Sequence, residues 1–403
     1  MTSSGEKALN YVAGLYFLYQ NLGQDVLEFA GTDASPVFNI TYPVTTSNYP
    51  YNLNYALDSD QKRFTYAGFA QLAYKMSSAV NVTLGMRYTH DDFESMNATL
   101  FNVYSRPVFA QTRQDFVTGK GEIDVNLSSD KMVYGSVSRG FKPGGVSNNS
   151  RPVLVPLTYK AEHVWSYELG SKNRFGSAAT LNMAAFFYDY RNLQYQQEDP
   201  VPFQGGVANV PKSHIWGAEV EGTLKLSRAL TLDGNLTQLD GELVGDYTTL
   251  DPSRARAATL AAAALGYAAS SPYTIALRAQ QVQNTNGNRP PKLPKWQGAI
   301  GATHVAQLGF GRLRSRLELL FRSKFEYRIF NDSARDVIPS YTLVNANIEL
   351  RSNDSRWAFT LSAKNIFDKD AIASRFSNPF GSFTTSNQYV PPREVTGAIK
   401  YNF

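Results

Sequence analysis

Apolar and polar residues alternate without exception along the last nine positions of the chain. Val395, Gly397, Ile399, Tyr401 and Phe403 fall on one side of an extended strand, and the residues between them fall on the other. Because successive side chains of a strand point to opposite faces, one face is expected to meet an apolar environment and the other water. An apolar strand that ends on an aromatic residue is typical of a membrane β-barrel, whose last strand closes the wall against lipid.

Fourteen segments of the chain carry this strand-type pattern. In 311–325, for example, Leu313 and Leu317 alternate with Arg314 and Arg316, which predicts one face toward lipid and one toward water. The predicted strands are 7–19, 62–76, 80–90, 113–126, 131–140, 163–174, 178–191, 214–226, 229–242, 296–306, 311–325, 340–351, 355–365 and 391–403.

The connections between these strands alternate in length. Six are short, and the seven long ones begin near residues 20, 91, 141, 192, 243, 327 and 368. This alternation predicts an antiparallel up-and-down meander in a membrane, with tight periplasmic turns and long outer loops. The longest loop, 243–295, contains an Ala-rich stretch at 255–269 that predicts a small helix. A propeller would show a blade-length sequence repeat, and a β-sandwich would not sort its loops by length.

The composition agrees with an all-β membrane protein. Hydrophobic residues make up 43% of the 403 positions, aromatic residues 13% and charged residues only 18%. No run of 18 apolar residues predicts a transmembrane helix. The chain has no cysteine, which excludes disulfides and thiolate sites, and its net charge of +5 comes from scattered basic residues. Nucleic acid is therefore not predicted as a partner.

No catalytic or cofactor motif stands out. The phosphate-binding, dinucleotide and zinc-protease motifs are missing from the sequence. His90, His163 and His214 lie near the outer ends of predicted strands, where they could bind haem or metal or form ordinary hydrogen bonds at the rim. Ser136 and Ser138 could be a nucleophile with His163 as base, but the Gly-x-Ser-x-Gly elbow is missing. We expect neither an enzyme nor a cofactor nor a metal site.

Two further features allow more than one interpretation. The basic residues of 311–325 could line a hydrated lumen, paired with Glu318 and neighbouring acids such as Glu349, or could form an electrostatic path for an anionic ligand. Aromatic residues in the long loops could hold a ligand or pack the loops. They are Tyr49, Tyr51, Phe101, Tyr104, Phe376, Phe380 and Phe383.

Several motifs resemble those of TonB-dependent outer-membrane receptors. The most specific is Tyr134-Gly-Ser-Val-Ser-Arg-Gly-Phe-Lys-Pro-Gly-Gly, which is similar to the family pattern YxSxSxGFKxGG. Five others follow the family's order over nearly the whole chain. They are Tyr11-Val-Ala-Gly-Leu-Tyr-Phe, Trp165-Ser-Tyr-Glu-Leu-Gly-Ser-Lys, Gly217-Ala-Glu-Val-Glu-Gly, Leu361-Ser-Ala-Lys-Asn-Ile-Phe-Asp-Lys and the Pro392-Arg ending.

The resemblance implies a 22-stranded transmembrane barrel in the bacterial outer membrane. Residues 1–403 would form one barrel domain with the last fourteen strands, and the amino-terminal signal peptide, TonB box, plug and about eight strands would lie outside this sequence. We therefore expect that this fragment alone folds poorly or leaves a gap between 7–19 and 395–403. The closing strand would carry Val395, Ile399, Tyr401 and Phe403, and its partners would be the lipid bilayer and the barrel assembly machinery.

The resemblance also implies a function. Such receptors import scarce, bulky nutrients, and the expected ligand here is a ferric siderophore complex, with energy from the TonB–ExbB–ExbD system acting through the amino-terminal region. Tyr104, Phe376 and Phe380 are the candidate ligand contacts in the loops. The alternatives are a passive porin, which would have an open lumen and no plug, and an outer-membrane lipid hydrolase.

Overall fold

The computed structural model describes residues 7–29, 53–101, 103–104, 108–147, 153–201, 204–377 and 385–403. Fourteen antiparallel strands form one curved sheet, the wall, in which each strand pairs with the next along this path. They are β1 (Leu9–Phe29), β2 (Leu53–Lys75), β3 (Val80–Phe101), β5 (Val108–Ser128), β6 (Lys131–Lys142), β9 (Glu162–Phe175), β10 (Ala179–Glu198), β11 (Gly205–Lys225), β12 (Leu230–Val244), β15 (Trp296–Leu308), β16 (Gly311–Arg322), β19 (Tyr341–Ser352), β20 (Trp357–Lys364) and β23 (Glu394–Tyr401).

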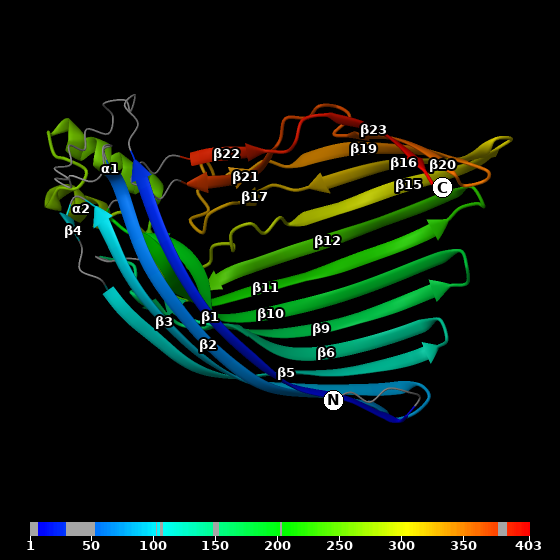
Figure 1. The fold of residues 1–403 in the computed structure, drawn as a ribbon, viewed down its shortest axis with the longest axis horizontal. Helices are drawn as coiled ribbons and strands as arrows, with labels where there is room; N and C mark the ends of the chain where they lie inside the picture. Colours follow the sequence, from blue (N-terminus) through cyan, green and yellow to red (C-terminus); the bar gives the residue numbers. More distant parts are fainter. Residues whose placement is uncertain are drawn as a thin grey trace.

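The remaining elements gather at one end of the wall (Figure 1). Two helices, α1 (Pro252–Ala264) and α2 (Pro272–Ala279), belong to the longest connection. Short strands form four two-stranded sheets, and β4 (Val103–Tyr104) adds to the edge of β3. The pairs are β7 (Gly145–Val146) with β8 (Thr158–Tyr159), β13 (Thr248–Leu250) with β14 (Val282–Asn284), β17 (Phe325–Glu326) with β18 (Val337–Ile338), and β21 (Ile372–Ser377) with β22 (Thr385–Tyr389).

The up-and-down antiparallel architecture predicted from the sequence is confirmed, and every predicted strand is present. Several strands are longer than predicted at their outer ends. The pairing of β10 with β11, for example, continues to Glu198 opposite Gly205. There both faces of the sheet meet water or loops, so backbone pairing continues after the alternation of side chains has ended. The predicted helix at 255–269 corresponds to α1, and α2 was not predicted.

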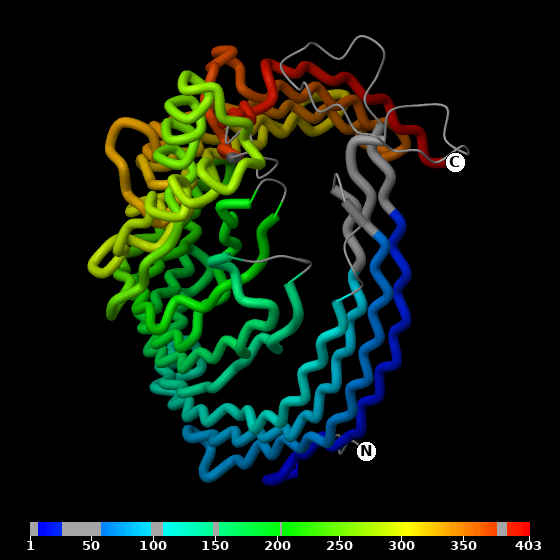
Figure 2. Tube along the Cα trace, turned by 90° about the vertical axis from the view of Figure 1, so that its left-hand side faces the viewer, coloured from blue at the N-terminus to red at the C-terminus, as the bar shows by residue number. Residues whose placement is uncertain are grey.

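The two faces of the wall are identified by a hairpin that lies inside it. The strand β8 contacts both β5 and β11, which are separated by three strands, so the hairpin must lie on the concave side. Figure 2, which looks along the wall from the loop end, shows this segment within the curve. The amide of Gly144 donates to Gln114 Oε1 at 3.0 Å. In β5, the residues that lie on the same face as Gln114 therefore point into the lumen. The alternate residues, such as Val117, point outward.

Polar groups on the lumen face bind one another across strands. Arg316 of β16 donates to Asp233 of β12 at 2.6 and 2.9 Å and to Glu318 at 2.9 Å. It reaches β12 across Gly301 of β15, where an added Cβ would lie 2.4 Å from the guanidinium. The glycine thus makes room for an ion pair that joins three strands, which supports the paired-lumen interpretation of the basic residues in 311–325.

Large apolar side chains cover the outward face. Leu317 and Leu361 are 54% and 52% exposed, as expected for groups whose solvent is lipid. Aromatic residues flank this apolar surface toward the loops, where Trp165 and Trp216 lie, and toward the short turns, where the tilted rings of Trp357 and Tyr401 have centroids 4.6 Å apart. Such belts mark the two membrane interfaces. No helix among the described residues is long and apolar enough to span a membrane.

The wall has two open edges. In the described residues β1 pairs only with β2, and β23 only with β20, so the expected gap between 7–19 and 395–403 is present. The two strands form the ends of the curved tube in Figure 2. The described residues include no globular domain within the wall.

The buried apolar clusters lie at the loop end, in a region that we name the outer cap. It comprises the described residues of 143–161, 193–212, 243–295, 325–340 and 366–391. One cluster joins Val210, Leu243, Ile329 and Phe330, a second joins Leu250 with Ala255, and a third joins Phe325, Tyr327 and Ile338. The cap is therefore a packed unit built from loops that are far apart in the sequence.

Candidate ligand-binding site in the outer cap

A cavity of about 290 Å³ lies in the outer cap, between the end of β10 and the segments that follow β13, β17 and β21. Aromatic, amide and charged side chains line it together. The lining residues are Gln194, Tyr195, Gln196, Gln197, Glu198, Thr249, Leu250, Pro252, Pro291, Lys292, Tyr327, Arg328, Phe330, Arg375 and Phe376.

A buried ion cluster forms one side of the cavity. Arg328 Nε donates to Asp336 Oδ1 at 2.6 Å, and its Nη1 lies 3.5 Å from Asp251 Oδ1. Both carboxylates are fully buried and the arginine side chain is 5% exposed. Asp251 is also the N-cap of α1 and accepts the amide of Ser253 at 2.8 Å. A charge in such a place is tolerated only when it is paired, so Arg328 fixes the geometry of three segments at once.

The carboxyl of Glu198 faces the same cavity. Burial raises the pKa of Glu198 to about 8, although the nearby Arg328 opposes this shift. Its Oε2 is buried and has no hydrogen-bond partner among the described residues. At neutral pH Glu198 is therefore mostly protonated and can donate a hydrogen bond into the cavity.

Two more cations border the cavity. Arg375 is held in place by the carbonyl oxygens of Arg335 and Val337 at 2.7 and 3.0 Å, and its guanidinium lies 5.9 Å from the Tyr327 ring. Lys292 is exposed and forms no ion pair with the described residues. The arrangement suits a ligand that combines negative charge with flat apolar or aromatic groups.

The buried carboxylate of Asp199 holds the segment 153–155 of the inner hairpin region against the end of β10. Asp199 Oδ2 accepts three consecutive backbone amides, those of Val153, Leu154 and Val155, at 2.9, 2.8 and 3.0 Å. Its side chain is 1% exposed. Charge-assisted bonds of this kind are strong, so Asp199 fixes the loop that enters the lumen to the end of β10.

Comparison with known proteins places this geometry in a family. Residues 3–366 match the family described as TonB dependent receptor-like, beta-barrel. The chain belongs to the TonB-dependent receptor family. The family and its solved relatives are proteins of the outer membrane, and this chain is accordingly an outer-membrane protein. The predicted family and location are thereby confirmed.

Individual relatives are distant. The pesticin receptor of Yersinia pestis is 25% identical over 184 residues, which are 45% of this chain and 27% of that receptor. The solved ferric yersiniabactin uptake receptor of Yersinia pestis has a TM-score of 0.74 at 17% identity, and the match covers 100% of this chain and 52% of that chain. The copper transporter OprC has a TM-score of 0.65 at 11% identity, covering 98% and 55%. These likenesses show the receptor fold, and this chain spans about half of each solved structure.

The predicted ligand contacts are only partly placed. Phe376 lines the cavity and is 56% exposed. Tyr104 is in β4, where its backbone pairs with Leu100, and its side chain lies outside the described part of the structure. Phe380 lies outside the described residues. The structure therefore brings one of the three predicted contacts to the candidate site, and their role as ligand contacts stays a prediction.

The histidines and serines considered for chemistry are dispersed. His90 Nδ1 lies 2.8 Å from Asp115 Oδ1, and His214 lies 3.4 Å from Asp189. Within the described residues no group of three or more potential ligands forms a metal site. The register places His163 opposite Phe141, three residues along β6 from Ser138. These contacts fit hydrogen bonding at the rim, which was one of the two interpretations of the histidines.

The residues of the last strand lie as the alternation predicts. Val395, Ile399 and Tyr401 face outward and pair in register with Ala363, Phe359 and Trp357 of β20. Phe403 packs edge-on against Tyr401, with ring centroids 4.9 Å apart. Their position at the edge of the wall is shown, and their role in closure and assembly stays a prediction.

The sequence reading missed the main features of the site. Gln194 to Glu198 lie beyond the predicted end of their strand, and Arg328 lies in the predicted long connection that begins near residue 327. One available signal was the run Phe325-Glu-Tyr-Arg-Ile-Phe, because three aromatic residues and an isoleucine within six positions are unusual in an exposed loop.

Proposed function

We propose that this chain is the wall and outer cap of a receptor for TonB-dependent uptake of a scarce nutrient, most specifically a ferric siderophore complex. Family membership carries the receptor function, and the cationic, aromatic cavity in the outer cap supports an anionic chelate as ligand. Two solved relatives, the ferric yersiniabactin uptake receptor of Yersinia pestis and the siderophore receptor PiuA of Acinetobacter baumannii, agree with this ligand class.

The cavity would bind one arm of such a complex. Its volume of about 290 Å³ falls just below the usual range of about 300–1,000 Å³ for small-molecule sites. The exposed Lys292 would attract a carboxylate or phenolate oxygen, and Phe376 would cover a flat ring. Protonated Glu198 would donate to an anionic oxygen rather than repel it. Binding and gating are the proposed chemistry, with no covalent step.

We also propose that further strands and a plug complete the barrel. The two unpaired edges of the wall support this, since an unpaired backbone group in hydrocarbon costs several kcal/mol. The coverage of about half of each solved relative agrees with it. The TonB–ExbB–ExbD system would act through that additional region. The barrel assembly machinery would recognise the last strand, with Phe403 at its end.

Uptake of radioactive iron tests the proposal. Cells without other siderophore receptors would produce the protein, with any further segments that its gene encodes, and would receive ferric complexes of several chelator classes. We expect accumulation of one anionic chelate class that stops when an uncoupler collapses the proton gradient. Uptake that continues under the uncoupler would indicate a passive porin instead.

Two matched variants test the cavity. Lys292→Gln removes an exposed cation at the cavity, and Lys225→Gln removes an exposed cation at the opposite end of the wall. We expect the first to weaken chelate binding about threefold to tenfold, as for one partly solvated charge contact, and the second to leave it unchanged. Equal binding by both variants would remove the cavity from the proposal.

A further inference from the structure

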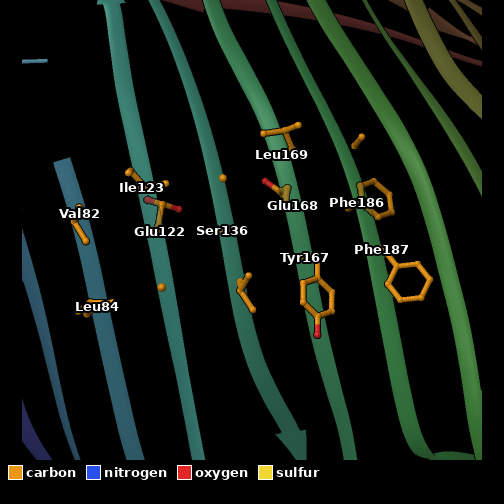
Figure 3. Close-up of a pocket in the computed structure, with 14 residues that line it drawn as sticks. Val82, Leu84, Glu122, Ile123, Ser136, Tyr167, Glu168, Leu169, Phe186 and Phe187 are labelled. Carbon is orange, nitrogen blue, oxygen red and sulfur yellow. The ribbon is translucent and has the colours of Figure 1, made fainter. Parts of the chain in front are cut away.

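An apolar groove of about 830 Å³ runs over the outward face of the wall, across β3, β5, β6, β9 and β10 (Figure 3). The groove exists because Gly121, Gly135 and Ala185 alternate with large residues across neighbouring strands. Gly121 pairs with Val137, and Gly135 and Ala185 both pair with Leu169. The two glycines and the alanine have no side chain, or only a methyl group, to fill the surface between their large neighbours.

Taller apolar side chains form the sides of the groove. They alternate with the small residues and point outward. Their exposed fractions of 37% to 67% agree with this orientation. They are Leu84, Ile123, Val137, Tyr167, Leu169 and Phe187. The acidic residues between them, Glu122 and Glu168, have the opposite parity and face the lumen, where Glu168 accepts from Tyr134. At the depth of the hydrocarbon, such a groove fits an acyl chain.

A cation stands at the outer end of this groove. Arg139 follows Val137 on the same face of β6, about 7 Å nearer to the loops at a rise of about 3.3 Å per residue. Its guanidinium lies 5.8 Å from the ring centroid of Trp165, which belongs to the outer aromatic belt. The charge is therefore at the level of lipid head groups.

Arg139 differs from the neighbouring cations of the outward face. Arg113 lies 2.9 Å from Asp92, and Arg191 lies 3.2 Å from Asp189. No carboxylate of the described residues forms an ion pair with Arg139. An unpaired guanidinium can bind a phosphate with two parallel hydrogen bonds. In a paired guanidinium, N–H groups already donate to a carboxylate.

We propose that this groove is a binding site for a phosphate-bearing lipid of the outer leaflet. One acyl chain lies over Gly121 and Gly135, and the phosphate contacts Arg139 beside Trp165. The charge complementarity selects a phosphorylated lipid over a neutral one, and the groove prefers a chain that can lie straight along the wall. This site is separate from the candidate cavity in the outer cap and does not depend on which nutrient is taken up.

The test uses the protein produced in the outer membrane and purified in detergent, with any further segments that its gene encodes. Native mass spectrometry counts phosphorylated lipids that survive repeated detergent washing. Gly135→Leu fills the groove, and the space allows it, because the nearest atoms to an added Cβ are 3.9 Å away. Gly397→Leu on the outward face of β23 is its control, since nothing lies within 4 Å of an added Cβ there.

Two arginine variants separate the head group from the chain. Arg139→Gln removes the proposed phosphate contact, and Arg314→Gln removes a cation on the lumen face as control. The washed protein is then mixed with the same lipid in its phosphorylated and dephosphorylated forms, and the affinity for each form is measured. We expect Gly135→Leu to retain little of either lipid, and Arg139→Gln to lose about tenfold in affinity for the phosphorylated lipid alone.

Several results would overturn the proposal. Equal retention by Gly135→Leu and Gly397→Leu would show that the bound lipid is a general surface layer. Equal affinity for the phosphorylated and dephosphorylated lipids would remove the role of Arg139. Far-ultraviolet circular dichroism and resistance to detergent unfolding check that each variant is folded, so a loss of lipid is not mistaken for a loss of structure.

Discussion

The wall and the outer cap share strands but are stabilised in opposite ways. In the wall, the largest apolar side chains point outward, as Leu317 and Leu361 do, and the polar groups line the concave side. In the outer cap, apolar groups such as Ile329 and Ile338 are completely buried, and charged groups are buried with them. All three buried apolar clusters of the described residues belong to the cap.

The two regions of this chain therefore place their apolar side chains in different surroundings. The wall relies on a continuous backbone hydrogen-bond ladder and on lipid as the solvent for its outward face. The cap relies on expulsion of water, as a soluble domain does, and on the pairing of buried charges such as Arg328 with Asp336. The same type of substitution should therefore have different consequences in the two regions.

The largest effect is expected from the ion cluster of the cap. Arg328→Met leaves Asp336 buried without its counter-charge and Asp251 with only the exposed Arg254 at 3.6 Å, and breaking a comparable buried pair costs about 3–5 kcal/mol. Hydrogen exchange should rise throughout 243–295 and 325–338 and stay unchanged in the wall strands. Arg335→Met is the control, because this arginine is 57% exposed in its pair with Asp332. An equal response to both variants would contradict a separately packed cap.

A somewhat smaller effect is expected from a charge on the lipid face of the wall. Leu361→Arg should destabilise the protein by about 2–4 kcal/mol, the cost of an arginine near the middle of a bilayer. Thr360→Arg places the same group on the lumen face, opposite Glu349, and should be nearly neutral. Urea unfolding in lipid vesicles measures both. Similar losses for both variants would mean that the two faces are assigned wrongly.

The clamp between hairpin and cap should give the next effect. Asp199→Ala leaves the amides of 153–155 without their acceptor, at a cost of about 1–3 kcal/mol. We expect faster hydrogen exchange and protease cleavage confined to this loop, while binding to detergent or lipid stays the same. Asp246→Ala, which removes one exposed contact to Asn284, serves as the comparison. Loosening of the wall itself would show that cap and wall are one cooperative unit.

A pH dependence of the cap is the fourth expected effect. Because the pKa of Glu198 is raised to about 8 in the folded state, this state holds a proton that the unfolded state releases near pH 4.5. The folded cap should therefore lose stability as the pH rises from about 4.5 to about 8, and change no further above that window. Glu198→Gln should remove this slope in hydrogen exchange of the cap. A slope that persists in the variant would assign it to another group.

The wall could be predicted from the sequence because its physics is local. Each strand must alternate lipid-facing and lumen-facing residues, so segments such as 214–226 and 355–365 show their structure without knowledge of their neighbours. The predicted strands end short of the outer ends of the observed strands, as in β10, which was predicted to end at residue 191. Beyond that level β10 continues to Glu198, and its Leu193 and Tyr195 pack against the buried cluster of the cap instead of lipid, so the alternation between lipid and lumen no longer applies.

The candidate site could not be predicted because it depends on contacts between distant segments. Asp251, Arg328 and Asp336 come together through the folding of two loops, and none of them belongs to a motif. Phe376 was predicted as a ligand contact from its type alone, and it does line the cavity. Lys292 and Glu198 owe their importance to exposure and burial, which only the packed cap determines.

The unequal connections of the wall constrain how its length can change over evolutionary time. A single residue inserted into a wall strand exchanges the lipid and lumen faces for the rest of that strand, because the side-chain period is two. The turns at the inner end, such as that between β11 and β12, are too tight to absorb the error. Insertions between α1 and α2, where 265–270 are exposed, shift no strand of the wall, and the entropic cost of a longer loop grows slowly. New sequence should therefore accumulate in the long outer loops, on the side that meets the surroundings.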